Sequence, residues 1–365
     1  MSPKRAVSAA LLAVTMAIAG VASASTLDLP APNVMTTSTF GDFLVYSLEL
    51  NQQCGAAGDP RCQPFIASQY PVSANEGTAT ANELVVYQGS TGNDNTPTPF
   101  AALSGALFDN PFRAPEGSAS SFDMSAANEP GSGGVVNGSA EFTGDKIGTW
   151  QVRISDLLTY LNGNDLVFLF DNNQSGSLST QFLGAWGQAQ ITDAAGNQVG
   201  ANCFELDDGP AGCGTTSPAS TVPPFVAVIG DFCVDKATGE AYRTGPTGDG
   251  LTANNAGQCS AANNPTHPAG GYFISNNLGN NAEFAIFNQA LNDAVYNPAN
   301  ASNFLTLNLK LRFLSDGSEQ MWICSDCNVP NAIIAPAVPE PATVLLVGTG
   351  LVALGGLAWR RSKRK

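Results

Sequence analysis

The chain has 365 residues, with 15 basic and 30 acidic side chains, one histidine and eight cysteines, and 43% of its residues are hydrophobic. The net charge of −15 argues against a nucleic-acid-binding protein, because an acidic surface repels phosphate backbones. The hydrophobic fraction excludes a disordered chain, and the low charged fraction of 12% with abundant glycine is typical of exported β-rich proteins.

Residues 1–24 have the pattern of a secretory signal peptide. Lys4 and Arg5 precede an uncharged apolar run, which ends at the small-residue triplet Ala22-Ser23-Ala24. This order predicts export by Sec-type machinery and cleavage by signal peptidase before Ser25. The alternative is an uncleaved N-terminal anchor.

The exported part, residues 25–338, keeps eight basic and 29 acidic side chains, a net charge of −21. Such a surface suits divalent cations or neutral sugars as partners. All eight cysteines lie in this part, and an even number outside the cytoplasm predicts disulfides. Eight cysteines allow 105 pairings. Short loop closure favours pairs between neighbours in sequence: Cys54–Cys62, Cys203–Cys213, Cys233–Cys259 and Cys324–Cys327.

The exported part is expected to be mostly β. Strands are predicted at residues 40–50, 83–87, 149–154, 166–170, 182–192, 225–229, 305–313 and 321–323. Residues 149–200 are expected to form a β-meander, and residues 201–271 a disulfide-pinned insertion. Leu305 to Phe313 alternates with polar residues, which predicts one buried and one wet face, and 315–318 is expected to turn this strand back into 321–323.

Helix is expected in two places. Ser155 is a candidate cap for a short helix through Tyr160. Farther on, Phe284, Phe287, Leu291 and Val295 follow helical spacing, and Asn297-Pro298 then ends the stripe. The expected fold is therefore an antiparallel β-sandwich-like ectodomain with long disulfide-pinned loops and one short helix, followed by a C-terminal transmembrane helix.

Candidate chemistry is sparse. His267 lies between prolines and has no second histidine to support a catalytic triad or a histidine-based zinc site. Cys324-Ser325-Asp326-Cys327 has C-x-x-C spacing, but the expected βαβ context of a redox motif is absent, so a static disulfide is favoured over a redox or metal role.

Two acidic segments are candidate sites. Asp171, Asn173 and Ser175 match the first half of a calcium loop, although Phe182 stands where the twelfth-position glutamate belongs, so an ordinary polar turn is the favoured interpretation. Glu205, Asp207 and Asp208 could supply paired carboxylates for glycoside hydrolysis, but a solvated acidic loop beside Cys203 is the default expectation. Calcium is the one cofactor that these residues suggest.

The C-terminus predicts membrane attachment. Residues 342–359 are uncharged and cover about 27 Å as a helix, close to a hydrocarbon core of ~30 Å. Trp359 ends the run, and five cations follow, which place the tail in the cytoplasm and residues 25–338 outside: Arg360, Arg361, Lys363, Arg364 and Lys365.

Before this span stands Pro339-Glu340-Pro341, and the two prolines keep this peptide extended. The tripeptide, the short span and the basic tail together resemble the PEP-CTERM sorting signal of bacterial exosortase substrates, over residues 338–365. The resemblance implies that an exosortase-like enzyme in the inner membrane recognises this region, removes the tail and passes the protein to the surface or matrix of an exopolysaccharide-producing cell. A protein that stays anchored by a single span is the alternative.

These observations predict a signal peptide (1–24), an extracytoplasmic domain (25–335, as one unit or as 25–200 and 201–335), a stalk (336–341), a span (342–359) and a tail (360–365). We expect a non-enzymatic surface or matrix protein, structural or adhesive in a biofilm, with exopolysaccharide as a possible partner. The alternatives are a carbohydrate- or calcium-binding module and, less favoured, a secreted hydrolase.

Overall fold

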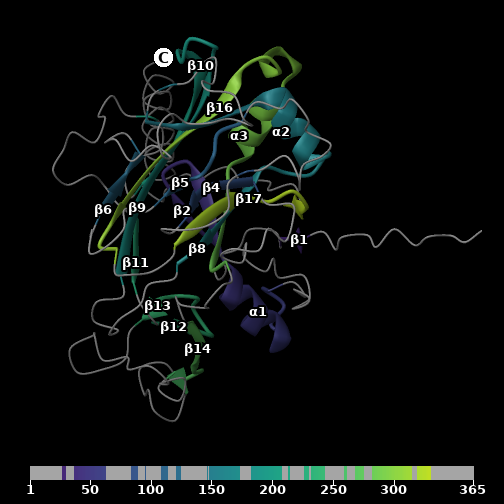
Figure 1. Cartoon of the computed structure of the whole chain (residues 1–365). Helices are drawn as coiled ribbons and strands as arrows, with labels where there is room; N and C mark the ends of the chain where they lie inside the picture. The colour runs from purple at the N-terminus through teal and green to yellow at the C-terminus, as the bar shows by residue number, and fades with distance from the viewer. Residues whose placement is uncertain are drawn as a thin grey trace, which may run out of the picture.

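A computed structural model describes residues 27–29, 37–62, 84–88, 95, 108–113, 121–124, 146, 148–172, 182–207, 213, 226–229, 232–242, 259–260, 268–274, 282–314 and 319–329. These residues form mostly antiparallel β-sheets with three α-helices (Figure 1). No helix within this described part is long and apolar enough to cross a membrane. The expected span at 342–359 lies outside the described residues.

A seven-stranded sheet forms one layer. Its order is β2-β3-β15-β8-β17-β4-β5, and it is antiparallel except for the β4–β5 pair. The strands are β2 (Thr37–Phe40), β3 (Phe43–Ser47), β15 (Phe284–Phe287), β8 (Val167–Asp171), β17 (Gln320–Ile323), β4 (Leu84–Gln88) and β5 (Phe112–Arg113).

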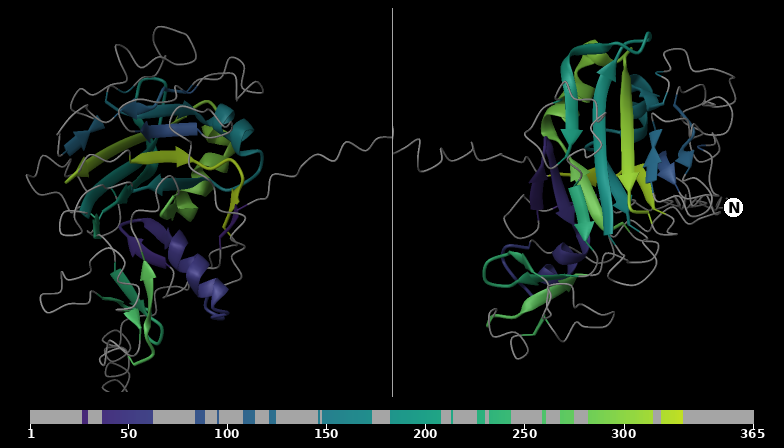
Figure 2. Two further views of the ribbon diagram at one scale, coloured as in Figure 1. Left: turned by 60° about the horizontal axis from the view of Figure 1, so that its bottom comes forward. Right: turned by 90° about the vertical axis from the view of Figure 1, so that its left-hand side faces the viewer.

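A six-stranded sheet forms the second layer, built around two long strands that pair over nine residues and stand side by side in Figure 2. Its path is β10-β9-β16-β6, with β11 also on β9 and β7 also on β16. The strands are β10 (Gln198–Leu206), β9 (Phe182–Thr192), β16 (Phe304–Arg312), β6 (Ser121–Asp123), β11 (Val226–Ile229) and β7 (Trp150–Arg153).

The main hydrophobic core lies between these two sheets. Alternate residues of the seven-stranded sheet, such as Phe168 and Ile323, share one buried cluster with alternate residues of the six-stranded sheet, such as Ile191 and Leu305. The helices α2 (Ile154–Leu161) and α3 (Gln289–Tyr296), with a 3₁₀ turn at Pro298–Asn300, lie together beside this core (Figure 1).

A smaller unit lies beside the two layers. The three-stranded sheet β13-β12-β14 consists of Ala241–Tyr242, Phe232–Asp235 and Gly271–Ile274, and the helix α1 (Leu48–Ala56) packs on it (Figure 1). Arg61 fixes this contact, because its guanidinium pairs with Asp59 at 2.6 Å and also donates to the backbone carbonyls of Lys236 and Ala237.

The strand predicted from residue 40 to residue 50 is wrong at its end. β3 stops at Ser47, whose hydroxyl accepts a hydrogen bond from the amide of Leu50 and so starts α1. Likewise the helix predicted from Phe284 begins later. Phe284 and Phe287 lie on β15, and Asn288 caps α3 by accepting from the amide of Leu291. A cap residue therefore separates strand from helix inside an apolar pattern that fits both periods.

Ser155 does not cap α2. The N-cap is Arg153, which has no side-chain capping bond but pairs with Asp156 one turn inside the helix at 2.9 Å. An acidic residue in the first turn is favourable there, because the helix dipole is positive at that end.

The meander predicted for residues 149–200 is wrong. Among the described residues of this stretch, only β9 and β10 form a hairpin, through a turn in which Gly196 has the expected positive φ of 76°. β8 belongs to the other sheet, where it is buried on both faces between β15 and β17. Its continuous apolar sequence fits a central strand covered on both sides.

The predicted return from β16 to β17 is also wrong, since β17 pairs with β8 and β4. β16 already has β9 on one side and β6 and β7 on the other, so it offers no free edge. The polar face of β16 is only partly wet: buried Thr306 bonds to Thr192 and Gln151, and buried Lys310 pairs with Asp123 at 3.1 Å, whereas Asn308 and Arg312 are half-buried.

The predicted insertion at 201–271 is only partly separate. β10 continues through Leu206 in the six-stranded sheet, and β11 pairs with β9 in the same sheet. Only β12, β13 and β14 stand apart. A boundary after residue 200 falls inside β10.

Candidate functional site

The two ends of the described domain meet at one place. The two-residue strands β1 (Leu27–Asp28) and β18 (Cys327–Asn328) pair in parallel, and the amide of Leu29 donates to the carbonyl of Asn328 at 2.8 Å. The residue expected to become the mature N-terminus is therefore two positions from β1, and the segment leading to the sorting motif leaves from β18 beside it.

Asp165 holds this junction closed. Its carboxylate accepts from the amide of Val329 at 2.7 Å, and its own amide donates to the carbonyl of Cys327 at 2.9 Å. The loop after α2 carries Asp165 into place by turning at Asn162, which adopts a left-handed conformation with φ 49°. One charge-assisted and one backbone hydrogen bond therefore fix the last described residues to the rest of the domain.

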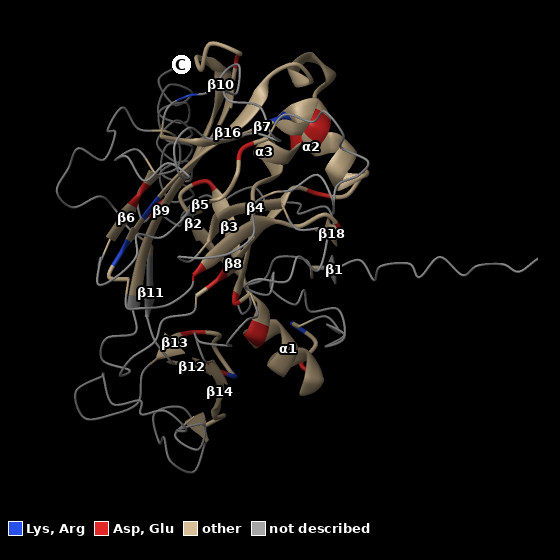
Figure 3. Cartoon of the chain, in the orientation of Figure 1, with Lys and Arg blue, Asp and Glu red and all other residues tan. Residues whose placement is uncertain are grey.

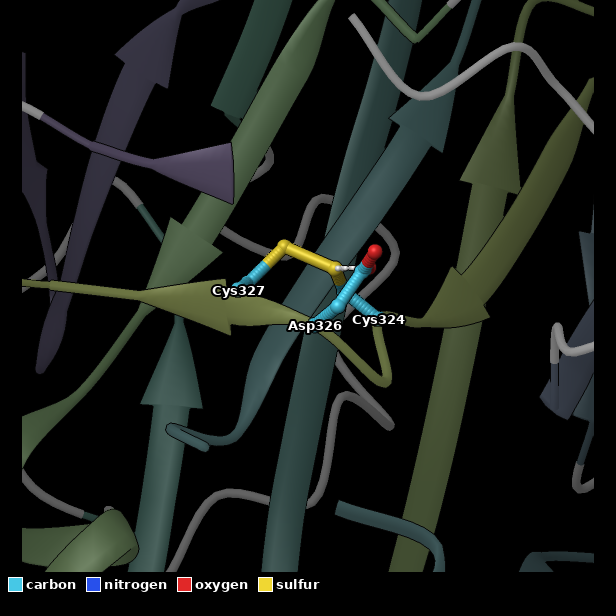
Figure 4. Close-up of side chains that lie close together, drawn as sticks. All are labelled: Cys324, Asp326 and Cys327. Carbon is cyan, nitrogen blue, oxygen red and sulfur yellow. Dashed lines mark hydrogen bonds between the residues drawn. A yellow bond between two sulfur atoms is a disulfide. The ribbon is translucent and has the colours of Figure 1, made fainter. Parts of the chain in front are cut away.

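The Cys324–Cys327 disulfide closes the turn between β17 and β18. Figure 4 shows the bond with Asp326 beside it, and Oδ1 of Asp326 lies 3.4 Å from Sγ of Cys324. Both sulfurs are buried, and burial also raises the pKa of Asp326. These three side chains are close enough to hold a metal ion, but a disulfide offers no thiolate ligands. The pair is therefore oxidised in this structure, and its purely structural role remains a prediction.

The other three disulfides connect neighbours in sequence: Cys54–Cys62, Cys203–Cys213 and Cys233–Cys259. With Cys324–Cys327, these are the four pairs that short loop closure favours, and they leave no free cysteine among all eight.

The acidic pair Glu205 and Asp207 is not the solvated loop that was expected. Both side chains are buried, because β10 runs through residue 206 and packs against the turn between β2 and β3. The amide of Asp42 donates to the carbonyl of Glu205, the carboxylate of Asp42 accepts from the amide of Glu205, and a Cβ on Gly41 would meet that carbonyl at 2.3 Å. The carboxylate of Glu205 accepts a hydrogen bond from the side-chain amide of Gln188 at 2.9 Å.

The candidate calcium loop is described only at its start. Asp171 and Asn172 are buried at the end of β8, whereas Asn173 and Ser175 lie outside the described residues. The amide of Asn172 donates to the carboxylate of Glu283, an acid that local sequence reasoning missed because it lies 111 positions away. Calcium binding at Asp171 remains a prediction.

Several other predicted sites lie outside the described residues. These are Asp208, His267, the signal-peptide positions Ala22, Ala24 and Ser25, the sorting motif at residues 339–341, the span and the basic tail.

Two family models match this chain, one over the exported domain and one over the C-terminal tail. A family model described as a domain of unknown function, DUF8239, matches residues 27–312, from the first residue of β1 to the last of β16. The chain belongs to the DUF8239 family. No curated protein and no solved structure matches it.

A second family model, the PEP-CTERM protein-sorting motif, matches residues 337–364 and confirms the resemblance of the tail. The DUF8239 domain is therefore carried by an exported protein that is sorted through its C-terminus. The motif implies exosortase-type sorting machinery and surface or membrane association.

Proposed function

We propose that this protein is a structural component of the cell surface or extracellular matrix. In this proposal an exosortase-like enzyme recognises Pro339-Glu340-Pro341, removes the span and tail, and releases the DUF8239 domain into an exopolysaccharide-rich layer. The observation that carries the proposal is the PEP-CTERM match at residues 337–364, which begins eight positions after the last described residue, Val329.

The junction of β1 and β18 supports this arrangement. Nine residues, 330–338, lie in sequence between Val329 and the sorting motif, and we call them the connector. Fully extended, this connector spans about 30 Å, which is enough to keep a folded domain clear of a membrane-embedded enzyme.

The composition of the domain supports a matrix role. Four disulfides constrain the chain outside the cell, and acidic residues outnumber basic ones, as Figure 3 shows over the described elements. A surface of this charge favours contact with neutral sugars, or with acidic polysaccharide through bridging divalent cations.

The test replaces the motif with alanine at Pro339, Glu340 and Pro341 in a host that has an exosortase. The wild-type protein should reach the surface fraction in a shortened form, and the triple variant should stay in the inner membrane at full length. Pro336→Ala, in the same connector, is the matched control and should behave as wild type. Surface delivery of the triple variant would contradict sorting by this motif.

The structural role needs its own readout. A deletion strain should retain less exopolysaccharide in its matrix, and retention should return with the wild-type gene but not with the triple variant. Normal retention in the deletion strain would refute the matrix role while leaving sorting intact.

A further inference from the structure

A cavity of about 450 Å³, open to the surface on the side of Ser38 and Ala241, lies between the two large sheets and next to the small one. The seven-stranded sheet contributes Phe168, Phe170 and Ile286, the six-stranded sheet contributes Leu307 and Leu309, and β12 contributes Phe232 and Val234. A volume of this size is within the range of small-molecule binding pockets.

The cavity exists because one strand offers small side chains to the core. The inward-facing positions of β9 are Leu183, Ala185, Gly187, Ala189 and Ile191, so three consecutive positions carry at most a methyl group. A Cβ added to Gly187 would meet only Leu206, at 3.6 and 3.9 Å, which is ordinary contact. Neither the backbone conformation nor a close neighbour therefore requires glycine at position 187, and a side chain there would not clash.

The lining is mostly apolar, and it also contains five polar, non-aromatic side chains: Thr37, Ser38, Ser47, Gln188 and Asn308. No described lining residue carries a charge, and seven are aromatic: Phe40, Phe43, Phe168, Phe170, Phe232, Tyr242 and Phe284. The lining runs from exposed residues, Ser38 and Ala241, to fully buried ones such as Val86. An apolar cavity holds water poorly, whereas an apolar ligand gains about 25 cal/mol for each Å² that it removes from water.

The charge of the protein disfavours an anionic ligand. The exported part has a net charge of −21, and no described lining residue is basic. An anionic ligand would be repelled here and would find no cation among the described lining residues to compensate for its lost hydration.

We propose that the DUF8239 domain binds an uncharged lipophilic small molecule in this cavity. The apolar body of the ligand lies against Phe168, Phe170 and Ile286 on one side and over Gly187 on the other. This binding is independent of the proposed matrix role and of sorting through the tail.

The test uses the full chain in lipid nanodiscs and a photoreactive probe, a medium-chain alkyl alcohol that carries a diazirine. After irradiation, peptide mass spectrometry should locate labels on β8, β9 and β15, and excess unlabelled alcohol should remove them. The predicted membrane span at 342–359 provides an internal control, because lipid-exposed labelling there should not saturate. The same probe with a carboxylate in place of the hydroxyl should label the cavity several-fold less.

Gly187→Leu is the decisive variant, because its side chain would occupy the cavity. It should lower labelling of β8 and β15 at least tenfold and melt at or above the wild-type temperature, since filling a cavity stabilises a fold. Gly187→Ala is the matched control and should keep most of the labelling.

Unsaturable labelling, equal labelling in a folded Gly187→Leu variant, or no labelling of the wild-type cavity would overturn the proposal. The last result is also expected if a segment of this chain occupies the space. Should Gly187→Leu fail to fold, Ala189→Leu takes its place, and competition by unlabelled alcohol in the wild-type protein still decides the question.

Discussion

The two faces of the seven-stranded sheet differ although the same strands build both. On the outer face Tyr46, Phe287 and Trp322 are at most 1% exposed and share a buried cluster with Leu29, Val329 and the Cys324–Cys327 disulfide. On the inner face the alternate residues, such as Phe168 and Ile286, line a cavity. The difference comes from the opposing element, because Leu29, Val329 and the Cys324–Cys327 disulfide cover one face and β9 brings Ala185, Gly187 and Ala189 to the other.

The two faces of the sheet therefore belong to two separate hydrophobic clusters that differ in how completely they are filled. The packed face lies at the β1–β18 junction, and the cavity-lining part of the other face lies beside the small sheet. Protein interiors are normally close-packed, so a cavity of about 450 Å³ is a feature that side-chain choice creates.

The largest expected effect is a difference in stability loss between alanine variants of two buried phenylalanines. Phe287→Ala should lower the free energy of unfolding by about 4 kcal/mol, as is usual for a packed phenylalanine. Phe168→Ala should cost about 2 kcal/mol, because a side chain that lines a cavity already lacks part of its contacts. Phe287 and Phe168 are 0% and 2% exposed on neighbouring strands, which makes the pair well matched. Urea unfolding measures both losses, and equal values would contradict the contrast.

The next effect concerns the disulfides. Cys233 and Cys259 are separated by 26 positions, and Cys324 and Cys327 by three. On the chain-entropy model, serine at both positions of the long loop should cost about 3.5 kcal/mol and at both positions of the short loop about 2 kcal/mol. A larger loss for the Cys324–Cys327 pair would show that this disulfide stabilises mainly through packing at the β1–β18 junction and not through loop closure.

The smallest effect is a pH dependence from a buried acid. Burial raises the pKa of Glu319, just before β17, from 4.5 to about 7. Between these pH values the unfolded chain loses a proton that the folded chain keeps, so stability should fall as pH rises, by on the order of 2 kcal/mol. Thermal melts from pH 4.5 to 7.5 should show this fall. In Glu319→Gln the corresponding slope should disappear, and a persisting slope would assign it to other groups.

Much of the local structure is predictable from the sequence. β9 begins and ends where its apolar pattern predicts, and β8 is buried as its continuous apolar run indicates. The neighbouring-cysteine scheme also agrees with the four disulfides, because short loops cost little entropy to close. Local patterns and short separations carry this information.

Long-range relations are not predictable in the same way. Nothing near β17 shows that it pairs with β8 and β4, since that choice depends on β16 having no free edge. Glu283 reaches Asn172 only because β15 lies beside β8. Asn288 is a typical N-cap residue, so the start of α3 could have been predicted from the sequence. The cavity could not, because it depends on the sizes of side chains from three sheets together.

The central claim is that this domain is sorted through its C-terminal motif, and the intact mass of the surface-localised protein tests it most directly. We predict a chain that begins at Ser25, ends near Pro341 and lacks eight hydrogens because all four disulfides are formed. A surface-localised chain that still extends to Lys365 would contradict removal of the tail.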